Sequence, residues 1–132
     1  MCDVSENVDL VREGLAAFLG GDVERALSFA HPEIVSFRAP PLPDPQTYHG
    51  TAGLLQMYAD WTRDFNEFEM EPIEFSEIGD SVVVEIINRG TGRASGVEVV
   101  GRFWFVYTVN GGRVVRQDAF ASRDQAIAAA SA

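Results

Sequence analysis

Three consecutive strand-like segments in the C-terminal half constrain the fold more than any other feature of the chain. Residues 81–88, 97–109 and 113–120 are rich in β-branched and aromatic side chains. Turn-forming residues separate these segments, at 89–96 and at 110–112, which is the pattern of a β-meander. A meander of this length has to curve around other elements, so we expect a cupped sheet with an interior pocket.

The remaining segments have the patterns of helices and of two further strands. Helical periodicity or capping signals occur in four stretches, near residues 5–19, 22–30, 51–65 and 123–130. Strands are expected at 34–38 and at about 68–78, where Pro72 indicates an edge position or a bulge. This order predicts one α+β domain spanning residues 1–132. Its curved mixed or antiparallel sheet is expected to wrap around the N-terminal helices, with the helices on one face and an interior hydrophobic pocket.

Composition excludes several classes of function. All ten basic residues are Arg, so the chain lacks the lysine that Schiff-base, pyridoxal-phosphate and P-loop sites require. The single cysteine, Cys2, excludes an intrachain disulfide and a multi-thiolate zinc site. The two histidines have no metal-ligand spacing, so we expect neither a metal nor a cofactor.

Charge and hydropathy indicate the partners to expect. A net charge of −10 argues against binding to nucleic acid or to an anionic membrane surface. No apolar run approaches the roughly 20 residues of a membrane span, and the acidic N-terminus is unlike a signal peptide. A cytoplasmic protein is therefore expected.

The segment 97–109 has apolar residues on both faces, so both faces are expected to meet protein or ligand. One face carries Phe103, Phe105 and Tyr107. We expect this face to form a homodimer contact, because exposed aromatic strips of that size are rare on monomers. The other face carries Arg102 and Trp104, and we expect it to line the pocket.

The register of the last hairpin decides which residues join Trp104. If residues 110–112 form a three-residue loop, Trp104 pairs with Asp118, and Arg102 and Arg116 share their face. A two-residue Asn-Gly turn would move Asp118 to the other face. We favour the first register, in which Asp118 can transfer a proton and Arg102 can orient a substrate or stabilise an anionic intermediate. The alternative is a structural carboxylate neutralised by the two arginines.

Other candidates are expected to contact a small hydrophobic ligand. Phe37 is expected in the pocket wall. Tyr58 and Trp61 belong to the aromatic stripe of the third helix, where a core role is the alternative reading of both. Tyr48 and His49 are expected at the pocket mouth.

Five short motifs are spread along nearly the whole chain. They are Gly21-Asp22 with a following Ala-Leu, His31-Pro32-Glu33, Tyr48-His49-Gly50, Arg93–Gly96 and Gly112–Arg116. In these motifs the chain resembles the NTF2-like superfamily and, within it, the SnoaL-like or polyketide-cyclase-like domains. The resemblance implies a cone-shaped α+β barrel with a hydrophobic cavity, usually in a homodimer packed through the sheet.

The resemblance also implies where catalytic residues would fall, and most of these positions lack a competent side chain. The general base, the oxyanion tyrosine and the protonated aspartate of ketosteroid isomerases would fall at Phe37, near Gly14 and at Trp104. Steroid isomerisation is therefore not favoured. Asp118 matches an acid that limonene-epoxide-hydrolase-like members and SnoaL-like cyclases carry in the last strand.

Three functions fit these residues, and they leave open whether the protein is an enzyme. The first is cofactor-independent acid–base catalysis on a small hydrophobic molecule, an isomerisation, cyclisation or hydration using Asp118 and Arg102. The second is a non-catalytic module that binds such a ligand without transforming it. The third is a dimeric assembly domain with a vestigial cavity.

Overall fold

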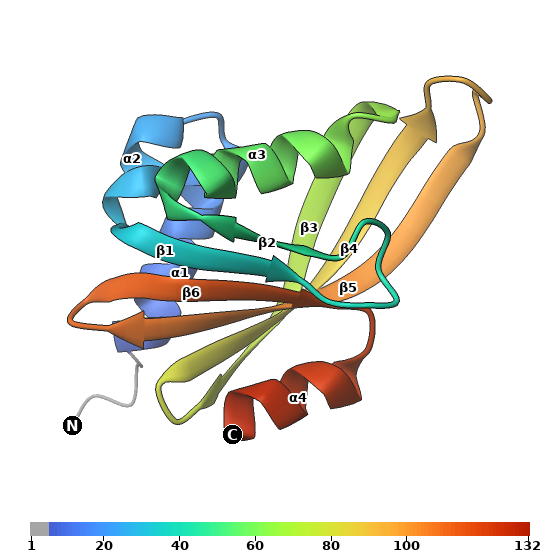
Figure 1. Cartoon of the computed structure of the whole chain (residues 1–132). Helices are drawn as coiled ribbons and strands as arrows, with labels where there is room; N and C mark the ends of the chain where they lie inside the picture. Colours follow the sequence, from blue (N-terminus) through green and yellow to red (C-terminus); the bar gives the residue numbers. More distant parts are fainter. Residues whose placement is uncertain (1–5) are drawn as a thin grey trace.

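The computed structural model describes residues 6–132, so the expectations for Cys2 and for a helix start at Ser5 lie outside the described residues. Within the described range the chain forms four helices and six strands (Figure 1). In chain order they are α1 (Glu6–Leu19), α2 (Val23–Ser28), β1 (Ala30–Arg38), β2 (Gln46–His49), α3 (Gly50–Thr62), β3 (Phe65–Ile78), β4 (Ser81–Gly92), β5 (Glu98–Asn110), β6 (Arg113–Phe120) and α4 (Arg123–Ser131).

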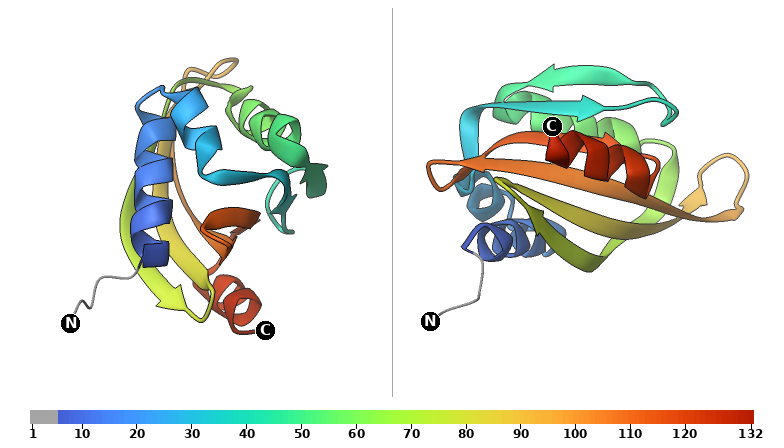
Figure 2. Two further views of the ribbon diagram at one scale, coloured as in Figure 1. Left: turned by 90° about the vertical axis from the view of Figure 1, so that its left-hand side faces the viewer. Right: turned by 90° about the horizontal axis from the view of Figure 1, so that it is seen from below.

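The strands form one curved, open, mixed sheet in the order β2-β1-β6-β5-β4-β3. β1 and β6 are parallel, and the other neighbours are antiparallel. The expected α+β fold, with a curved sheet around the N-terminal helices, is confirmed. One detail is wrong: α4 lies away from α2 and α3, on the outer face of the sheet (Figures 1 and 2). There Ala126 packs with Val83 and Val106.

The main hydrophobic core lies between the concave face of the sheet and the first three helices. Val11 of α1 and Met57 of α3 belong to one buried cluster with Phe103, Phe105 and Tyr107 of β5. The expectation that these three aromatic residues form a dimer contact is therefore wrong, because the chain's own helices already cover their face. Dimerisation itself stays a prediction.

The last hairpin differs from both registers considered from the sequence. Its turn has two residues, Gly111 and Gly112, with φ of 62° and 75°, values that favour glycine in such a turn. A bulge at Val115 then adds one residue to β6. Because the bulge offsets the shorter turn, Trp104 and Asp118 still share a face as expected. They are not direct partners, since each lies opposite a different residue.

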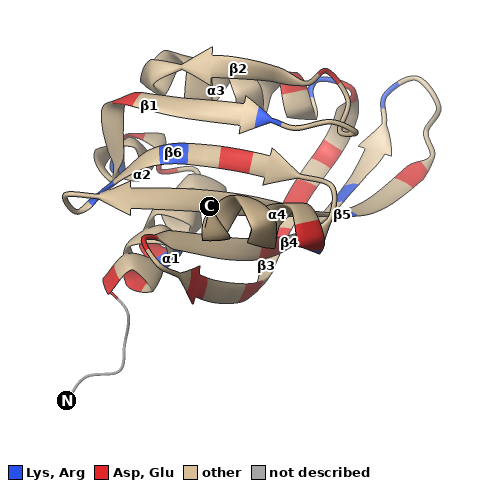
Figure 3. Cartoon of the chain, turned by 60° about the horizontal axis from the view of Figure 1, so that its bottom comes forward, with Lys and Arg blue, Asp and Glu red and all other residues tan. Residues whose placement is uncertain are grey.

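The segment around Pro72 behaves as its sequence indicates. β3 is an edge strand, and its register with β4 shifts between Pro72 and Glu74, so the edge and the bulge are both present. Acidic residues, red in Figure 3, lie along this edge strand. The short strand β2 was not expected from the sequence, which suggested a direct entry into α3.

None of the helices formed by residues 6–132 combines the length and apolar character needed to cross a membrane.

Candidate functional site

A cavity opens between the concave face of the sheet and helices α1, α2 and α3. The space that the centres of water molecules could occupy in it is about 80 Å³. One water needs roughly 10–15 Å³ on the same measure. The wall is mostly apolar: α1 contributes Leu15 and Phe18, α3 contributes Met57, and β5 contributes Phe105. Such a wall suits an apolar guest better than bulk water.

Aromatic contacts shape this cavity. The rings of Phe18 and Tyr58 meet edge-on, with centroids 4.4 Å apart, and so connect α1 to α3. Trp61 lies 4.5 Å from Phe103 between ring centroids. The Arg38 guanidinium lies over Trp61, with its carbon 4.6 Å from the indole centroid. Trp61 therefore contacts both the cavity and a buried cation.

Tyr58, Tyr107 and Gln117 bring polar atoms to the cavity wall. Burial raises the pKa of both tyrosines above the ordinary value of 10.0, so both keep their protons at neutral pH. Among the lining residues, all of which belong to the described part of the chain, none is Asp, Glu or His. The cavity can therefore donate hydrogen bonds, but it offers no side chain that would act as a base near neutral pH.

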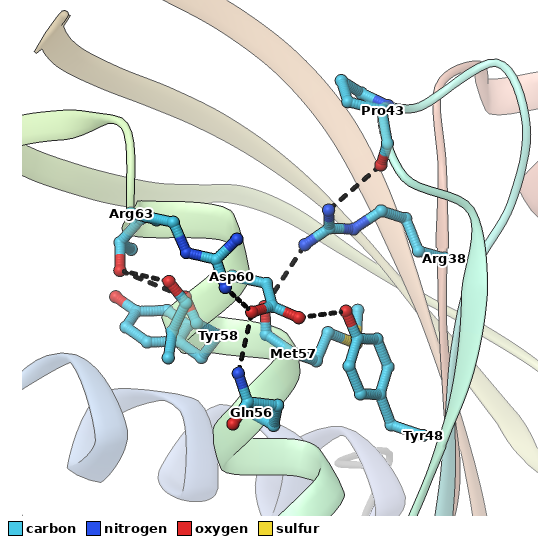
Figure 4. A network of polar contacts seen from close by, with 10 residues as sticks. Arg38, Pro43, Tyr48, Gln56, Met57, Tyr58, Asp60 and Arg63 are labelled. Carbon is cyan, nitrogen blue, oxygen red and sulfur yellow. Dashed lines mark hydrogen bonds and ion pairs between the residues drawn. The ribbon is translucent and has the colours of Figure 1, made fainter.

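A polar network joins α3 to β2, the edge strand of the sheet (Figure 4). The Tyr48 hydroxyl donates to Oδ2 of Asp60 at 2.7 Å. Burial, and next this hydrogen bond, raise the pKa of Tyr48 to about 12. The hydrogen bonds from Tyr48 and Gln56 lower the pKa of Asp60, and Arg63 pairs with the same carboxylate. Tyr48 thus ties β2 to α3, and its hydroxyl is already engaged.

Asp118 lies on the opposite face of β6 from Gln117, outside the cavity. Arg116 donates from Nε to both carboxylate oxygens at 2.9 Å. Burial raises the pKa of Asp118, and the contact with Arg116 opposes that rise. Arg102 instead pairs with Glu85, Nη1 to Oε2, at 2.9 Å. The expected position of Asp118 and Arg102 in the pocket wall is wrong. The pair of Asp118 with Arg116 fits the alternative of a structural carboxylate, with Arg102 engaged elsewhere.

Three further candidates lie outside the cavity. Trp104 packs beside α4, and its buried indole N–H has no hydrogen-bond partner among the described residues. Phe37 is the β1 neighbour of Asp118 and shares its outward face. His49 is exposed at the start of α3. By contrast, Tyr58 and Trp61 line the cavity, and their contact with a ligand stays a prediction.

Phe105, Tyr107 and Gln117 are among the cavity residues that the sequence did not identify. Strand alternation does place Phe105 and Tyr107 on one face, but it does not say which face is the inner one. A signal was present in the last helix, whose small apolar residues Ala126 and Ala130 need a face of the sheet to cover. Had that helix been placed against the Trp104 face, the face with Phe105 and Tyr107 would have been identified as the inner one.

A metal site would require several His, Cys, Asp or Glu side chains close together. Within residues 6–132, no three His, Cys, Asp or Glu side chains lie closely enough together to hold an ion.

Comparisons with known proteins agree with this architecture. Residues 11–117 match the model of the SnoaL-like domain. TerC, co-crystallised with polyporic acid, is 23% identical, with a TM-score of 0.77 over 97% of this chain and 100% of that chain. An NTF2-like protein of unknown function from Burkholderia pseudomallei K96243 is 24% identical, with a TM-score of 0.77 over 98% and 100%. An NTF2-like protein from Burkholderia thailandensis E264 is 19% identical, with a TM-score of 0.79 over 94% and 98%. No curated protein matches the chain.

Proposed function

Because the chain belongs to the SnoaL-like domain family and shares its fold with NTF2-like proteins of known structure, we propose that it binds a small, largely apolar molecule in its interior cavity. The observation that carries this proposal is an apolar cavity into which a few polar side chains project, Tyr58, Tyr107 and Gln117. Sites with this composition are the usual form of small-molecule pockets. The co-crystallisation of TerC with polyporic acid supports a small organic ligand as the class.

The chemistry of the cavity supports binding without transformation over acid–base catalysis. A general base has to come within hydrogen-bond reach of the proton it removes. The two residues expected to catalyse, Asp118 and Arg102, lie on the outer face, whereas the cavity tyrosines hold their protons tightly. A ligand in the cavity would meet hydrogen-bond donors and aromatic rings, and no carboxylate.

Ligand binding can be tested with 2-naphthol, a two-ring probe with one hydroxyl group, by calorimetry and by thermal shift. Leu54 lines the cavity, whereas the adjacent Leu55 is 36% exposed and lies outside it. Leu54→Trp should fill the cavity and weaken binding by about tenfold or more, and the matched control Leu55→Trp should leave it unchanged. Wild-type protein should also gain thermal stability with rising probe concentration.

Two results would contradict the proposal. Equal effects of the two tryptophan variants would place the probe elsewhere. Loss of binding in Asp118→Asn, with binding retained in Leu54→Trp, would identify the outer face as the functional one and restore the role predicted for Asp118.

A further inference from the structure

Three polar residues form a row across the concave face of the sheet. Ser36 of β1 is the Cα partner of Gln117 of β6, and Gln117 is the Cα partner of Tyr107 of β5. Directly opposite residues on neighbouring strands lie about 5 Å apart and point to the same side. All three are nine-tenths buried or more, with exposed fractions of 0%, 9% and 7% for Ser36, Gln117 and Tyr107.

This polar row has unused hydrogen-bonding capacity. The Ser36 hydroxyl is closed to solvent and has no partner among residues 6–132. Gln117 and Tyr107 also make no side-chain hydrogen bond to any part of the chain that the structure describes. Buried polar groups nearly always have partners. The Ser36 hydroxyl is such an exception, and the two polar side chains next to it line the cavity, where a bound molecule can supply the missing hydrogen bonds.

We infer that Gln117 and Tyr107 select a ligand with a neutral oxygen, a carbonyl or a hydroxyl, and that Ser36 positions Gln117 for this contact. The inference rests on the proposed function, because it assumes that the ligand occupies the cavity. Gln117 and Tyr107 line the cavity and can reach the ligand. Ser36 is the neighbour of Gln117 on β1 and does not line the cavity, so its free hydroxyl can engage one end of the amide when the other end binds the ligand.

The surroundings of the row favour a neutral group over an ionised one. Amide and hydroxyl groups both donate and accept, so they match a carbonyl or a hydroxyl equally well. Arg38, the nearby buried cation, lies over Trp61 and does not itself line the cavity. Its Nη1 and Nη2 donate to the backbone oxygens of Pro43 and Met57 at 3.0 and 3.2 Å, and its Nε has no partner among the described residues. An anionic ligand would lose its hydration in an apolar wall without a charged partner. A net charge of −10 opposes it further.

Three probes with the same ring system test this selectivity by calorimetry at neutral pH: naphthalene, 2-naphthol and 2-naphthoate. Wild-type protein should bind 2-naphthol about 5–10-fold more tightly than naphthalene, the range expected for one net hydrogen bond. It should bind 2-naphthoate about tenfold more weakly than 2-naphthol or worse. Gln117→Met should reduce the preference for the hydroxyl by about half or more, since Tyr107 remains, while leaving naphthalene affinity within about twofold of wild type.

Variants of Ser36 test its positioning role. Ser36→Ala should reduce the preference for 2-naphthol over naphthalene by about half or more without weakening naphthalene itself. Ser36→Thr, which keeps a hydroxyl, should restore the preference. A purely structural role would instead change both affinities together.

The outcomes separate this inference from the proposed function. If naphthalene binds and Gln117→Met keeps the full hydroxyl preference, or if 2-naphthoate binds best, the selectivity inference fails and the cavity proposal stands. If none of the three probes binds wild-type protein, or if Leu54→Trp leaves their affinities unchanged, the proposed function fails as well.

Discussion

Replacing Phe103 by alanine should destabilise the protein strongly, and the size of the effect follows from its position. Phe103 is 1% exposed and its ring contacts those of Trp61 and Phe105, with centroids 4.5 and 4.9 Å apart. Truncation of a buried phenylalanine costs about 3–5 kcal/mol. With an unfolding entropy of about 2.1 cal/mol/K per residue, that loss in a 132-residue chain lowers the melting temperature by roughly 11–18 °C.

Calorimetry at two protein concentrations a hundredfold apart provides the assay. If Phe103 lies in the chain's own core, the loss in melting temperature should be the same at both concentrations. If it lay in a subunit contact, the loss would depend on concentration, because dissociation and unfolding would be linked. Val100→Ala is the control on the same strand, because its exposed side chain should change stability by less than about 0.5 kcal/mol. A loss below about 1 kcal/mol for Phe103→Ala would refute the core assignment.

Two further substitutions test local features by urea unfolding. Because burial raises the folded-state pKa of Asp118 above its ordinary value of 3.8, its favourable contribution is complete below pH 3.8 and is lost as the pH rises through the raised pKa. Wild type should therefore lose stability relative to Asp118→Asn over that range, and a relative gain would show that Arg116 dominates. Gly14→Ala in α1 should stabilise the protein by about 0.5–1 kcal/mol, because alanine favours the helix over the unfolded chain. Its new Cβ would lie 3.4 Å from Phe29, which is an ordinary van der Waals contact. A net loss would mean that this contact is too close.

Most of the fold is predictable from the sequence because its signals are local. The β-branched run at residues 81–88 and the glycine turn after Asn110 specify strands and a hairpin whatever surrounds them. β4 continues to Gly92, through residues that the sequence assigned to a turn. The cap at Ser122, which accepts a hydrogen bond from the Gln125 N–H at 3.2 Å, is equally local. β2 lacks such a signal, because its four residues gain their strand structure from pairing with β1.

The candidate site is less predictable because it depends on which face of the sheet turns inward. Alternation alone groups Trp104 with Asp118 and Tyr107 with Gln117, and both groups are apolar enough to be buried. The difference arises from long-range packing: α1 and α3 cover one face, and α4 covers part of the other. In the sequence Asp118 stands out as an isolated acid in an apolar strand, but the neutral Gln117 beside it is the residue that faces the cavity.

A crystal structure of the protein soaked with 2-naphthol would test the central claim most directly. We expect electron density for the two rings among Phe18, Tyr58 and Phe105, with the hydroxyl oxygen within hydrogen-bond distance of Gln117. Density on the outer face beside Asp118, with an empty interior, would contradict the account.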